Sequence, residues 1–240
     1  MRADQYLTTH GHYDSRARAQ AAIKAGLVSV DGKVIKKPSE KIKEGATVQA
    51  GREHPWVSRG GIKLDHALRL FKVNPAGMTC LDVGASTGGF SQVLVHHGAS
   101  KVYAVDVGHG QLHAQLQSEP KIISMEGQDA RTLSPKMLSP APELIVCDAS
   151  FISAMKVLEN PLRLAAPKAG LITLVKPQFE VGKVNIGRGG LVKSEELGLR
   201  ALDIVRHWVR EQGWTVQDTG PSPIKGGSGN MEYLLHATRN

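Results

Sequence analysis

Charged side chains stand at the ends of the predicted buried strands, and these residues are the best placed to do chemistry. The four are Asp82, Asp106, Asp148 and Lys176, which end the apolar segments 78–83, 101–106, 143–148 and 170–175. Ligands of doubly wound parallel sheets bind at the carboxyl ends of the strands. A purely structural protein would have little reason to place a charge at each of these ends. The pattern therefore predicts a ligand site in which carboxylates accept hydrogen bonds from hydroxyl or amino groups.

A glycine-rich turn follows the first of these strands, in the sequence Leu-Asp-Val-Gly-Ala-Ser-Thr-Gly-Gly-Phe at residues 81–90. Glycine lacks a Cβ, so its backbone can approach a bound cofactor closely. The turn does not match the dinucleotide fingerprint G-x-G-x-x-G, because Ala85, Ser86 and Thr87 follow Gly84. Alone, the turn is compatible with a nucleotide-like cofactor or with a plain structural turn.

Two further aspartates are candidates for contacts with a nucleoside. Asp106 could accept hydrogen bonds from ribose hydroxyls, and the alternative is a helix N-cap. Asp129 follows the next strand, where an adenine would lie, and could accept from its amino group; the alternative is a turn cap. His109 and His113 lie four residues apart, but no third ligand is evident, so we expect no metal site.

The elements that must position these residues alternate between strands and helices. Besides the four strands above, apolar segments predict strands at 122–125, 214–218 and 231–237. Amphipathic segments predict helices at 60–72, 89–98, 154–166 and 194–212. This alternation is typical of an α/β fold with a mostly parallel, doubly wound sheet.

The first quarter of the chain differs from the rest in charge and pattern. The chain has 30 Lys and Arg against 22 Asp and Glu, and residues 1–60 alone hold eleven basic against six acidic residues. Ser15 is typical of the N-cap of a helix over residues 16–25, and alternating apolar residues around Asp31-Gly32 predict a β-hairpin. We expect this basic module to bind nucleic acid, with a solvated charged face as the alternative. The contact candidates are Arg16, Arg18, Lys24, Lys33 and Lys37.

Cysteine use and hydropathy indicate the compartment. Cys80 and Cys147 both fall in predicted buried strands, as reduced core thiols of a cytoplasmic protein do. No apolar signal region and no run of membrane-spanning length occurs, so we expect no membrane partner.

Residues 51–57 break the periodic pattern of apolar residues between the two parts of the chain. We therefore expect an RNA-binding domain at 1–53, a linker at 54–58 and a larger domain at 59–240.

The order of motifs resembles the TlyA group of ribosomal RNA ribose methyltransferases, which join an alpha-L RNA-binding module to a methyltransferase domain of the FtsJ/RrmJ type. The N-terminal helix and hairpin resemble the alpha-L motif, which grips structured RNA through phosphate and shape contacts. Matching motifs follow in order within residues 56–64, 82–90, 148–153, 174–180 and 227–233. The resemblance implies a Rossmann-like class I methyltransferase domain with a seven-stranded sheet and S-adenosylmethionine as cofactor.

The resemblance also implies roles for individual residues. Those implied to bind the cofactor are Asp82, Gly84, Ser86, Gly88, Gly89, Phe90, Asp106 and Asp129. A catalytic Lys-Asp-Lys-Glu tetrad maps to Lys63, Asp148, Lys176 and Glu232. A ribose 2′-hydroxyl must be oriented and must lose its proton as it attacks the methyl group. Lys176 could accept that proton if neutral, or orient the hydroxyl, and the sequence leaves both roles open. For each of the four, an ordinary ion pair is the structural alternative.

Two more residues are expected to contact RNA. Phe151 ends the motif Asp-Ala-Ser-Phe, which lacks the two prolines common in enzymes that methylate exocyclic amines, and this favours ribose chemistry. Phe151 could stack on an extruded base, with a core aromatic as the alternative. Arg188 lies in the glycine-rich segment 183–190, which suits a flexible loop that closes over RNA or a surface loop without a role.

The leading hypothesis is therefore S-adenosylmethionine-dependent 2′-O-methylation of a ribose in ribosomal RNA, at a cytidine as the family implies. One rival is an RNA-binding ribosome-assembly factor with vestigial catalysis. The other is a membrane-lytic haemolysin, the activity for which the family was first named. The short termini lean toward the large ribosomal subunit as partner, whereas the sequence leaves the nucleotide and the oligomeric state open.

Overall fold

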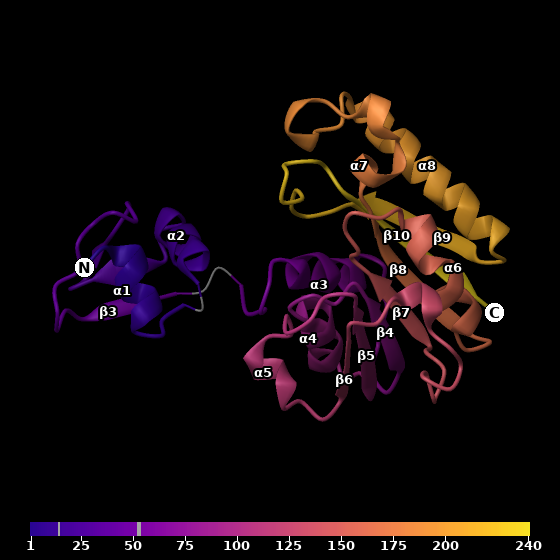
Figure 1. Ribbon diagram of the computed structural model, residues 1–240, viewed down its shortest axis with the longest axis horizontal. Coiled ribbons are helices and arrows are strands. Elements are labelled where there is room, and N and C mark those ends of the chain that lie inside the picture. Colours follow the sequence, from indigo (N-terminus) through magenta and orange to yellow (C-terminus); the bar gives the residue numbers. More distant parts are fainter. Residues whose placement is uncertain (14, 52–53) are drawn as a thin grey trace. The chain divides into compact units, whose positions relative to one another are not determined.

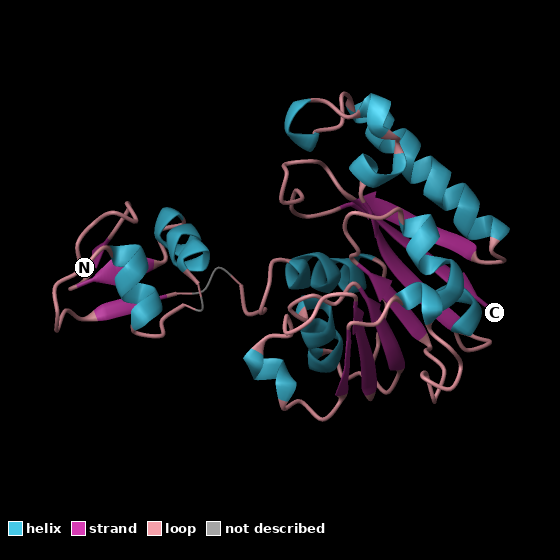
Figure 2. Cartoon of the chain, in the orientation of Figure 1, coloured by secondary structure: helices cyan, strands magenta, loops and turns pink. Residues whose placement is uncertain are grey.

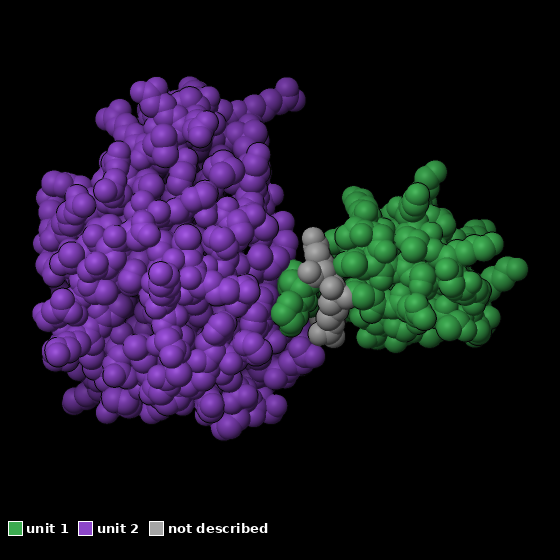
Figure 3. All heavy atoms as spheres, turned by 180° about the vertical axis from the view of Figure 1, so that it is seen from behind, with its two compact units in different colours: residues 1–55 green, residues 56–240 purple. Residues whose placement is uncertain are grey.

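The computed structural model describes residues 1–13, 15–51 and 54–240 and divides the chain into two compact units. The first unit is Met1–Pro55 and the second is Trp56–Asn240 (Figure 3). Residues 56–58, which we placed in the linker, lie in the second unit. The predicted end of the first domain, residue 53, lies outside the described residues.

The first unit packs two helices against a small antiparallel sheet. Ser15 Oγ accepts a hydrogen bond from Arg18 N at 3.3 Å, so the predicted N-cap is confirmed. Asp31 and Gly32 both have positive φ, as the tight two-residue turn of a hairpin requires. The helices are α1 (Ala3–Thr9) and α2 (Arg16–Lys24), and the sheet has the order β2-β1-β3, with β1 (Val28–Val30), β2 (Lys33–Val34) and β3 (Val48–Ala50).

The second unit is built on a seven-stranded sheet with the order β6-β5-β4-β7-β8-β10-β9. Its strands are β4 (Thr79–Val83), β5 (Lys101–Asp106), β6 (Ile122–Glu126), β7 (Leu144–Cys147), β8 (Ala169–Val175), β9 (Thr215–Pro221) and β10 (Tyr233–Arg239). Strands β4 to β8 pair in parallel, whereas β10 is antiparallel to both β8 and β9. The strand order reverses at β4, where ligands of such sheets bind.

Helices cover both faces of this sheet (Figures 1 and 2). Successive residues of a strand point to opposite faces. Leu81 and Val83 of β4 accordingly share a core with residues of α6 and α8, whereas Cys80 shares the other core with residues of α3 and α4. The helices are α3 (Gly60–Leu70), α4 (Gly89–His96), α5 (Ala114–Gln117), α6 (Ala154–Leu164), α7 (Pro177–Glu180) and α8 (Glu195–Glu211).

The predicted α/β fold with a doubly wound, mostly parallel sheet is confirmed. Each predicted strand and long helix is present, with ends shifted by a few residues. The four-residue helices α5 and α7 escaped prediction, because so short a helix has no amphipathic repeat. Within the described ranges, no helix combines the length and apolarity needed to cross a membrane.

Trp56 packs against the first turn of α3, at Gly61. A Cβ added to Gly61 would clash with Cβ and ring atoms of Trp56. We expect Gly61→Ala to lower the free energy of unfolding by about 1–3 kcal/mol, the cost of overpacking a core. Urea denaturation measures this, with Gly187→Ala as control, because Gly187 has extended backbone and only ordinary contacts. Equal stability of the two variants would contradict this packing.

Candidate active site

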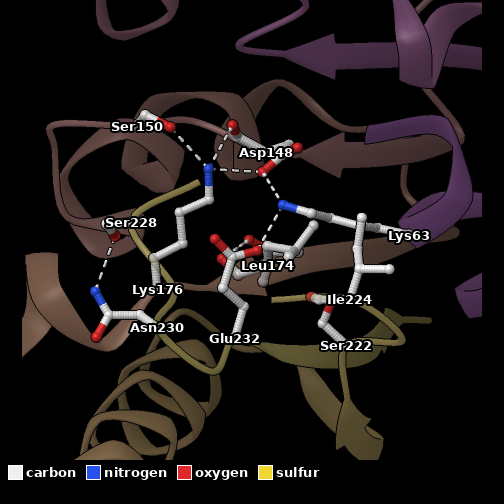
Figure 4. A network of polar contacts seen from close by, with 11 residues as sticks. Lys63, Asp148, Ser150, Leu174, Lys176, Ser222, Ile224, Ser228, Asn230 and Glu232 are labelled. Carbon is white, nitrogen blue, oxygen red and sulfur yellow. Dashed lines mark hydrogen bonds and ion pairs between the residues drawn. The ribbon is translucent and has the colours of Figure 1, made fainter. Parts of the chain in front are cut away.

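Four charged side chains from distant parts of the chain converge at the carboxyl edge of the sheet (Figure 4). Lys63 projects from α3, whereas Asp148 follows β7, Lys176 follows β8 and Glu232 precedes β10. Lys176 Nζ lies 2.7 Å from Asp148 Oδ1, and Lys63 Nζ lies 2.5 Å from Glu232 Oε2. Lys63 Nζ is also 3.6 Å from the same Asp148 oxygen, so the two ion pairs form one network.

The network is largely shielded from water. Lys63, Lys176 and Glu232 are buried, with Glu232 only 2% exposed. Taking a charged group out of water is costly unless an opposite charge compensates it. Two amines facing two carboxylates satisfy this condition as a set, although each lysine alone would be a buried uncompensated charge.

The Lys176 amine has three oxygen neighbours. It forms an ion pair with Asp148 Oδ1, and Nζ donates hydrogen bonds to the Asp148 backbone carbonyl at 3.1 Å and to Ser150 Oγ at 2.8 Å. Ser150 is exposed, whereas Asp148 is half-buried. Ser150 is therefore the partner that a ligand could displace.

All four charged residues line a cavity of about 470 Å³. Its wall continues into the glycine-rich turn through Gly84, Ser86, Gly89 and Phe90. Gly227 and Ser228, from the loop before β10, complete the rim. The predicted catalytic residues and half of the predicted cofactor residues thus face the same space.

The glycines of the turn are required by packing within the protein itself, and the close approach of a cofactor to them stays a prediction. Gly84 and Gly88 have φ of 80° and 88°, a region that favours glycine. A Cβ on Gly84 would lie 2.9 Å from Ala149 Cα, and one on Gly88 would lie 2.5 Å from a Leu116 methyl group. The Cβ position of Gly89 is occupied by the Ser58 hydroxyl.

A second cavity of about 620 Å³ shares Gly84, Ser86 and Asp148 with the first. Asp106 lines it and ties the turn to the loop after β5, because Oδ2 accepts from Ser86 N at 2.8 Å and Oδ1 from Gly108 N at 2.7 Å. Asp106 is therefore not a helix N-cap. Its carboxylate retains lone pairs that two ribose hydroxyls can use.

Asp129 also lines the second cavity but is largely engaged within its own loop. Its carboxylate accepts from Arg131 N at 2.9 Å and from the Arg131 guanidinium, and it caps a short 3₁₀ helix. These hydrogen bonds from Arg131 hold the pKa of Asp129 below its usual value. The turn-cap interpretation thus describes the observed contacts, and a contact with adenine stays a prediction.

Asp82 lies behind the turn and is not among the residues lining either cavity. It is fully buried; Oδ2 accepts from Ser91 Oγ at 2.6 Å, and Oδ1 has no hydrogen-bond partner within the described part of the chain. Burial raises the pKa of Asp82 to about 7, opposed by Ser91 and reinforced by the charges of Asp148 and Asp106. Gly88 likewise lies outside both linings.

Comparison with known proteins identifies the family. The FtsJ-like methyltransferase family matches residues 56–239, and the S4 domain family matches residues 1–48. The chain belongs to the FtsJ-like methyltransferases. It is 42% identical over 236 residues to the 16S/23S rRNA (cytidine-2′-O)-methyltransferase TlyA of Mycobacterium tuberculosis, a match that covers 98% of this chain and 88% of the relative.

Two further relatives carry a different name. Hemolysin A of Brachyspira hyodysenteriae is 37% identical over 98% of this chain and 99% of its own. The solved structure of a candidate hemolysin from Streptococcus thermophilus is 35% identical, with a TM-score of 0.79 over 100% of this chain and 88% of that chain. The similarity therefore extends over both units of the chain.

As an FtsJ-like methyltransferase, the enzyme uses S-adenosylmethionine, and the two adjoining cavities fit that molecule. The second cavity offers the Asp106 carboxylate together with apolar side chains, Val107, Ile152 and Val157, as a nucleoside requires. The first cavity places Ser86 and the turn next to the charged network. A ligand spanning both would present its far end to Lys176.

Phe151 stands at the mouth shared by both cavities. It is 93% exposed and has φ of 66°, a left-handed conformation that bulky residues rarely adopt. The core-aromatic alternative is therefore wrong. Its ring centroid lies 5.7 Å from that of Phe179, so two aromatic rings flank the opening.

The basic candidates of the first unit differ in their exposure and in their ion pairs. Lys24, Lys33 and Lys37 are exposed. Arg16 donates to the buried carboxylate of Asp4 at 2.8 Å. Hydrogen bonds from Arg2 and Arg16 hold the pKa of Asp4 well below its usual range.

Sequence reasoning missed Asp4, Ser150 and Ser58 as parts of these sites. A lone acid among basic residues gives no signal that it will organise two arginines. Ser150 had a usable signal, since it lies two residues after Asp148 in a matched motif. Ser58, whose hydroxyl fills the space beside Gly89, had the same kind of signal, since it lies in the matched motif at residues 56–64.

Asp82 gives a pH-dependent prediction for stability. The native pKa of about 7 lies above the value of about 3.9 expected in the unfolded chain, so the native state holds a proton that the unfolded state has released. As the pH rises from about 4 to about 7, the free energy of unfolding of the wild type should therefore fall by about 1.4 kcal/mol per pH unit relative to that of Asp82→Asn. Urea denaturation across this range measures it. A difference between the two proteins that does not change with pH would contradict the assignment.

Proposed function

We propose that this enzyme transfers a methyl group from S-adenosylmethionine to the 2′-hydroxyl of a cytidine ribose in ribosomal RNA. The observation that carries the proposal is the Lys176–Asp148 pair, which is held by Lys63 and Glu232 and faces a cavity continuous with the glycine-rich turn. An enzyme that methylates an exocyclic amine would hold that group by acceptors, whereas the group that we assign to the substrate here is the Lys176 amine, a donor to a hydroxyl oxygen.

The residues around both cavities would divide the binding of the cofactor. S-adenosylmethionine supplies an electrophilic methyl group on a sulfonium. Asp106 would accept from the ribose hydroxyls, and Asp129 from the adenine amino group. The backbone from Gly84 to Phe90 would follow the amino-acid end, while Asp82 supports the turn from behind through Ser91.

Lys176 would orient the target hydroxyl. We assign the 2′-oxygen to the position that Ser150 Oγ now holds, where it accepts from Nζ and keeps its other lone pair for the methyl carbon. The oxygen–carbon bond would form as the carbon–sulfur bond breaks, and the strongly acidic proton of the alkylated oxygen would pass to water. Lys63 and Glu232 would fix Asp148, which fixes Lys176.

RNA would be held by groups of both units. Phe151 would stack on the extruded base, as enzymes that flip nucleotides do with exposed aromatic rings. Phosphates would be contacted by Arg188 and by the basic side chains of the first unit, Arg16, Arg18, Lys24, Lys33 and Lys37. The S4 domain match to residues 1–48 supports RNA contacts by the first unit.

The ribosomal substrate is supported by the relatives. The Mycobacterium tuberculosis relative is named for both 16S and 23S RNA, so both ribosomal subunits are candidates. We favour the large subunit as the first partner to test. A ribosomal substrate would also mean that the enzyme works in the cytoplasm.

The decisive variant is Lys176→Ala. Loss of the group that orients the hydroxyl should lower kcat at least about 100-fold, while the affinities for cofactor and RNA persist. Transfer of labelled methyl groups to separated small and large subunits measures this. Lys168→Ala is the matched control, because Lys168 is an exposed lysine just before β8. Full activity of Lys176→Ala, or no transfer by the wild type to either subunit, would contradict the proposal.

Ser150→Ala tests whether the Ser150 hydroxyl is displaced by the substrate or takes part in catalysis itself. If the substrate hydroxyl replaces Ser150 on Lys176, removal of the serine hydroxyl should leave kcat within about tenfold of the wild type, since one neutral hydrogen bond is at stake. Single-turnover transfer at saturating RNA measures this. A loss as large as that of Lys176→Ala would make Ser150 itself a catalytic residue.

A further inference from the structure

Asn230 is a buried polar residue whose side chain joins two segments near the active site. It is 5% exposed. Its Oδ1 accepts from Val192 N at 2.9 Å, and its Nδ2 donates to the Gly190 carbonyl at 2.9 Å. Nδ2 also donates to Ser228 Oγ at 3.0 Å (Figure 4). Both strong backbone contacts cross about forty residues of sequence. A buried amide that uses both ends in this way specifies one arrangement of the segments it joins.

One of these segments, residues 182–193, forms a hairpin, and its closure over RNA stays a prediction. Ile186 and Val192 form an antiparallel bridge, and Gly187 N donates to the Leu191 carbonyl at 2.7 Å. Gly189 and Gly190 at its tip both have positive φ, as a tight turn requires. In Figure 1 the orange segment between α7 and α8 lies beside the yellow segment that leads into β10.

The hairpin presents a surface suited to single-stranded nucleic acid. It contains Lys183, Arg188 and Lys193 and no acidic residue. Lys193 Nζ donates to the Val184 carbonyl at 2.7 Å, whereas Arg188 and Lys183 are exposed. Val184 is also 77% exposed, so an apolar side chain stands among the cations. Such surfaces combine phosphate neutralisation with contacts to base faces.

The other segment that Asn230 holds is the turn at residues 226–230, which borders the catalytic network. Gly226 N donates to the Asn230 carbonyl at 2.9 Å, and the Glu232 carboxylate fills the space where a Cβ of Gly226 would stand. Gly227 and Ser228 line the cavity of Lys176. Asn230 thus fixes the hairpin to the wall that carries Glu232.

We infer that Asn230 is a positioning residue, which locks the hairpin 182–193 so that Arg188 holds the RNA strand flanking the target nucleotide in register with Lys176. This inference rests on the proposed function. The reacting groups lie in the turn and at the strand ends, whereas the RNA strand is longer than the cavity. A fixed external contact is what keeps a polymer substrate in a reactive position.

The test variant is Asn230→Asp, which keeps the acceptor for Val192 N but removes both donations and faces the Gly190 carbonyl with a carboxylate. We expect KM for RNA to rise at least about tenfold, kcat to fall, and the affinity for S-adenosylmethionine to stay within about twofold. Asn74→Asp is the control, because Asn74 is an exposed turn residue whose Oδ1 accepts from Ala76 N. It should match the wild type.

A double-mutant cycle with Arg188→Ala separates positioning from a general structural effect. Arg188→Ala should raise KM for RNA by itself, and adding Asn230→Asp should raise it by less than about threefold more, since both changes remove the same contact. Hydrogen exchange should show faster exchange at Gly187 N, which donates within the hairpin, in Asn230→Asp, with the amides of β8 unchanged. Wild-type KM in Arg188→Ala, or effects of the two changes that multiply, would overturn the inference. The wild type's own methyl transfer tests the proposed function separately.

Discussion

The Asp148 carboxylate between two buried lysines is the interaction on which the rest of the site depends. Its Oδ1 lies 2.7 Å from Lys176 Nζ and 3.6 Å from Lys63 Nζ. Two ammonium groups so close together and so far from water would repel each other strongly without it. Glu232 compensates the second charge from the far side of Lys63. The charges of the four residues therefore depend on one another, and a substitution at any one of them changes the electrostatic environment of the Lys176 amine.

The sheet topology explains how four distant residues meet. Parallel strands β7 and β8 deliver Asp148 and Lys176 at the same edge, because their carboxyl ends lie side by side. β10 runs antiparallel to β8, with Tyr233 opposite Val175, so its beginning lies where β8 ends. Glu232 therefore comes level with Lys176. The antiparallel direction of β10 is therefore what brings Glu232 into the network.

Much of this architecture could be predicted from residue patterns. The strands that precede or end at Asp106 and Lys176 are predicted by apolar runs that stop at a charged residue. The turn at Asp31-Gly32 is predicted by the residue types that such turns favour. Lys63 and Glu232 lie on no such pattern, and only family resemblance pointed to them. Local sequence does not encode that α3 and the start of β10 face one another.

The features that residue patterns left open depend on contacts between distant segments. Whether Gly84 and Gly88 make room for a ligand or for Ala149 and Leu116 depends on how the turn packs. The order of the hairpin 182–193 depends on Asn230, about forty residues away. The segment contains four glycines, which in isolation suggest a flexible loop, but Gly189 and Gly190 occupy turn positions at its tip with positive φ.

The most direct test of the account is the chemical position of the transferred methyl group. Ribosomal RNA methylated by the enzyme can be digested to nucleosides and analysed by mass spectrometry, with the label carried by S-adenosylmethionine. An amine that presents a ribose oxygen to the methyl carbon predicts 2′-O-methylcytidine, and the modified linkage should resist alkaline cleavage. A methyl group on a base, or an RNA without label, would contradict the account.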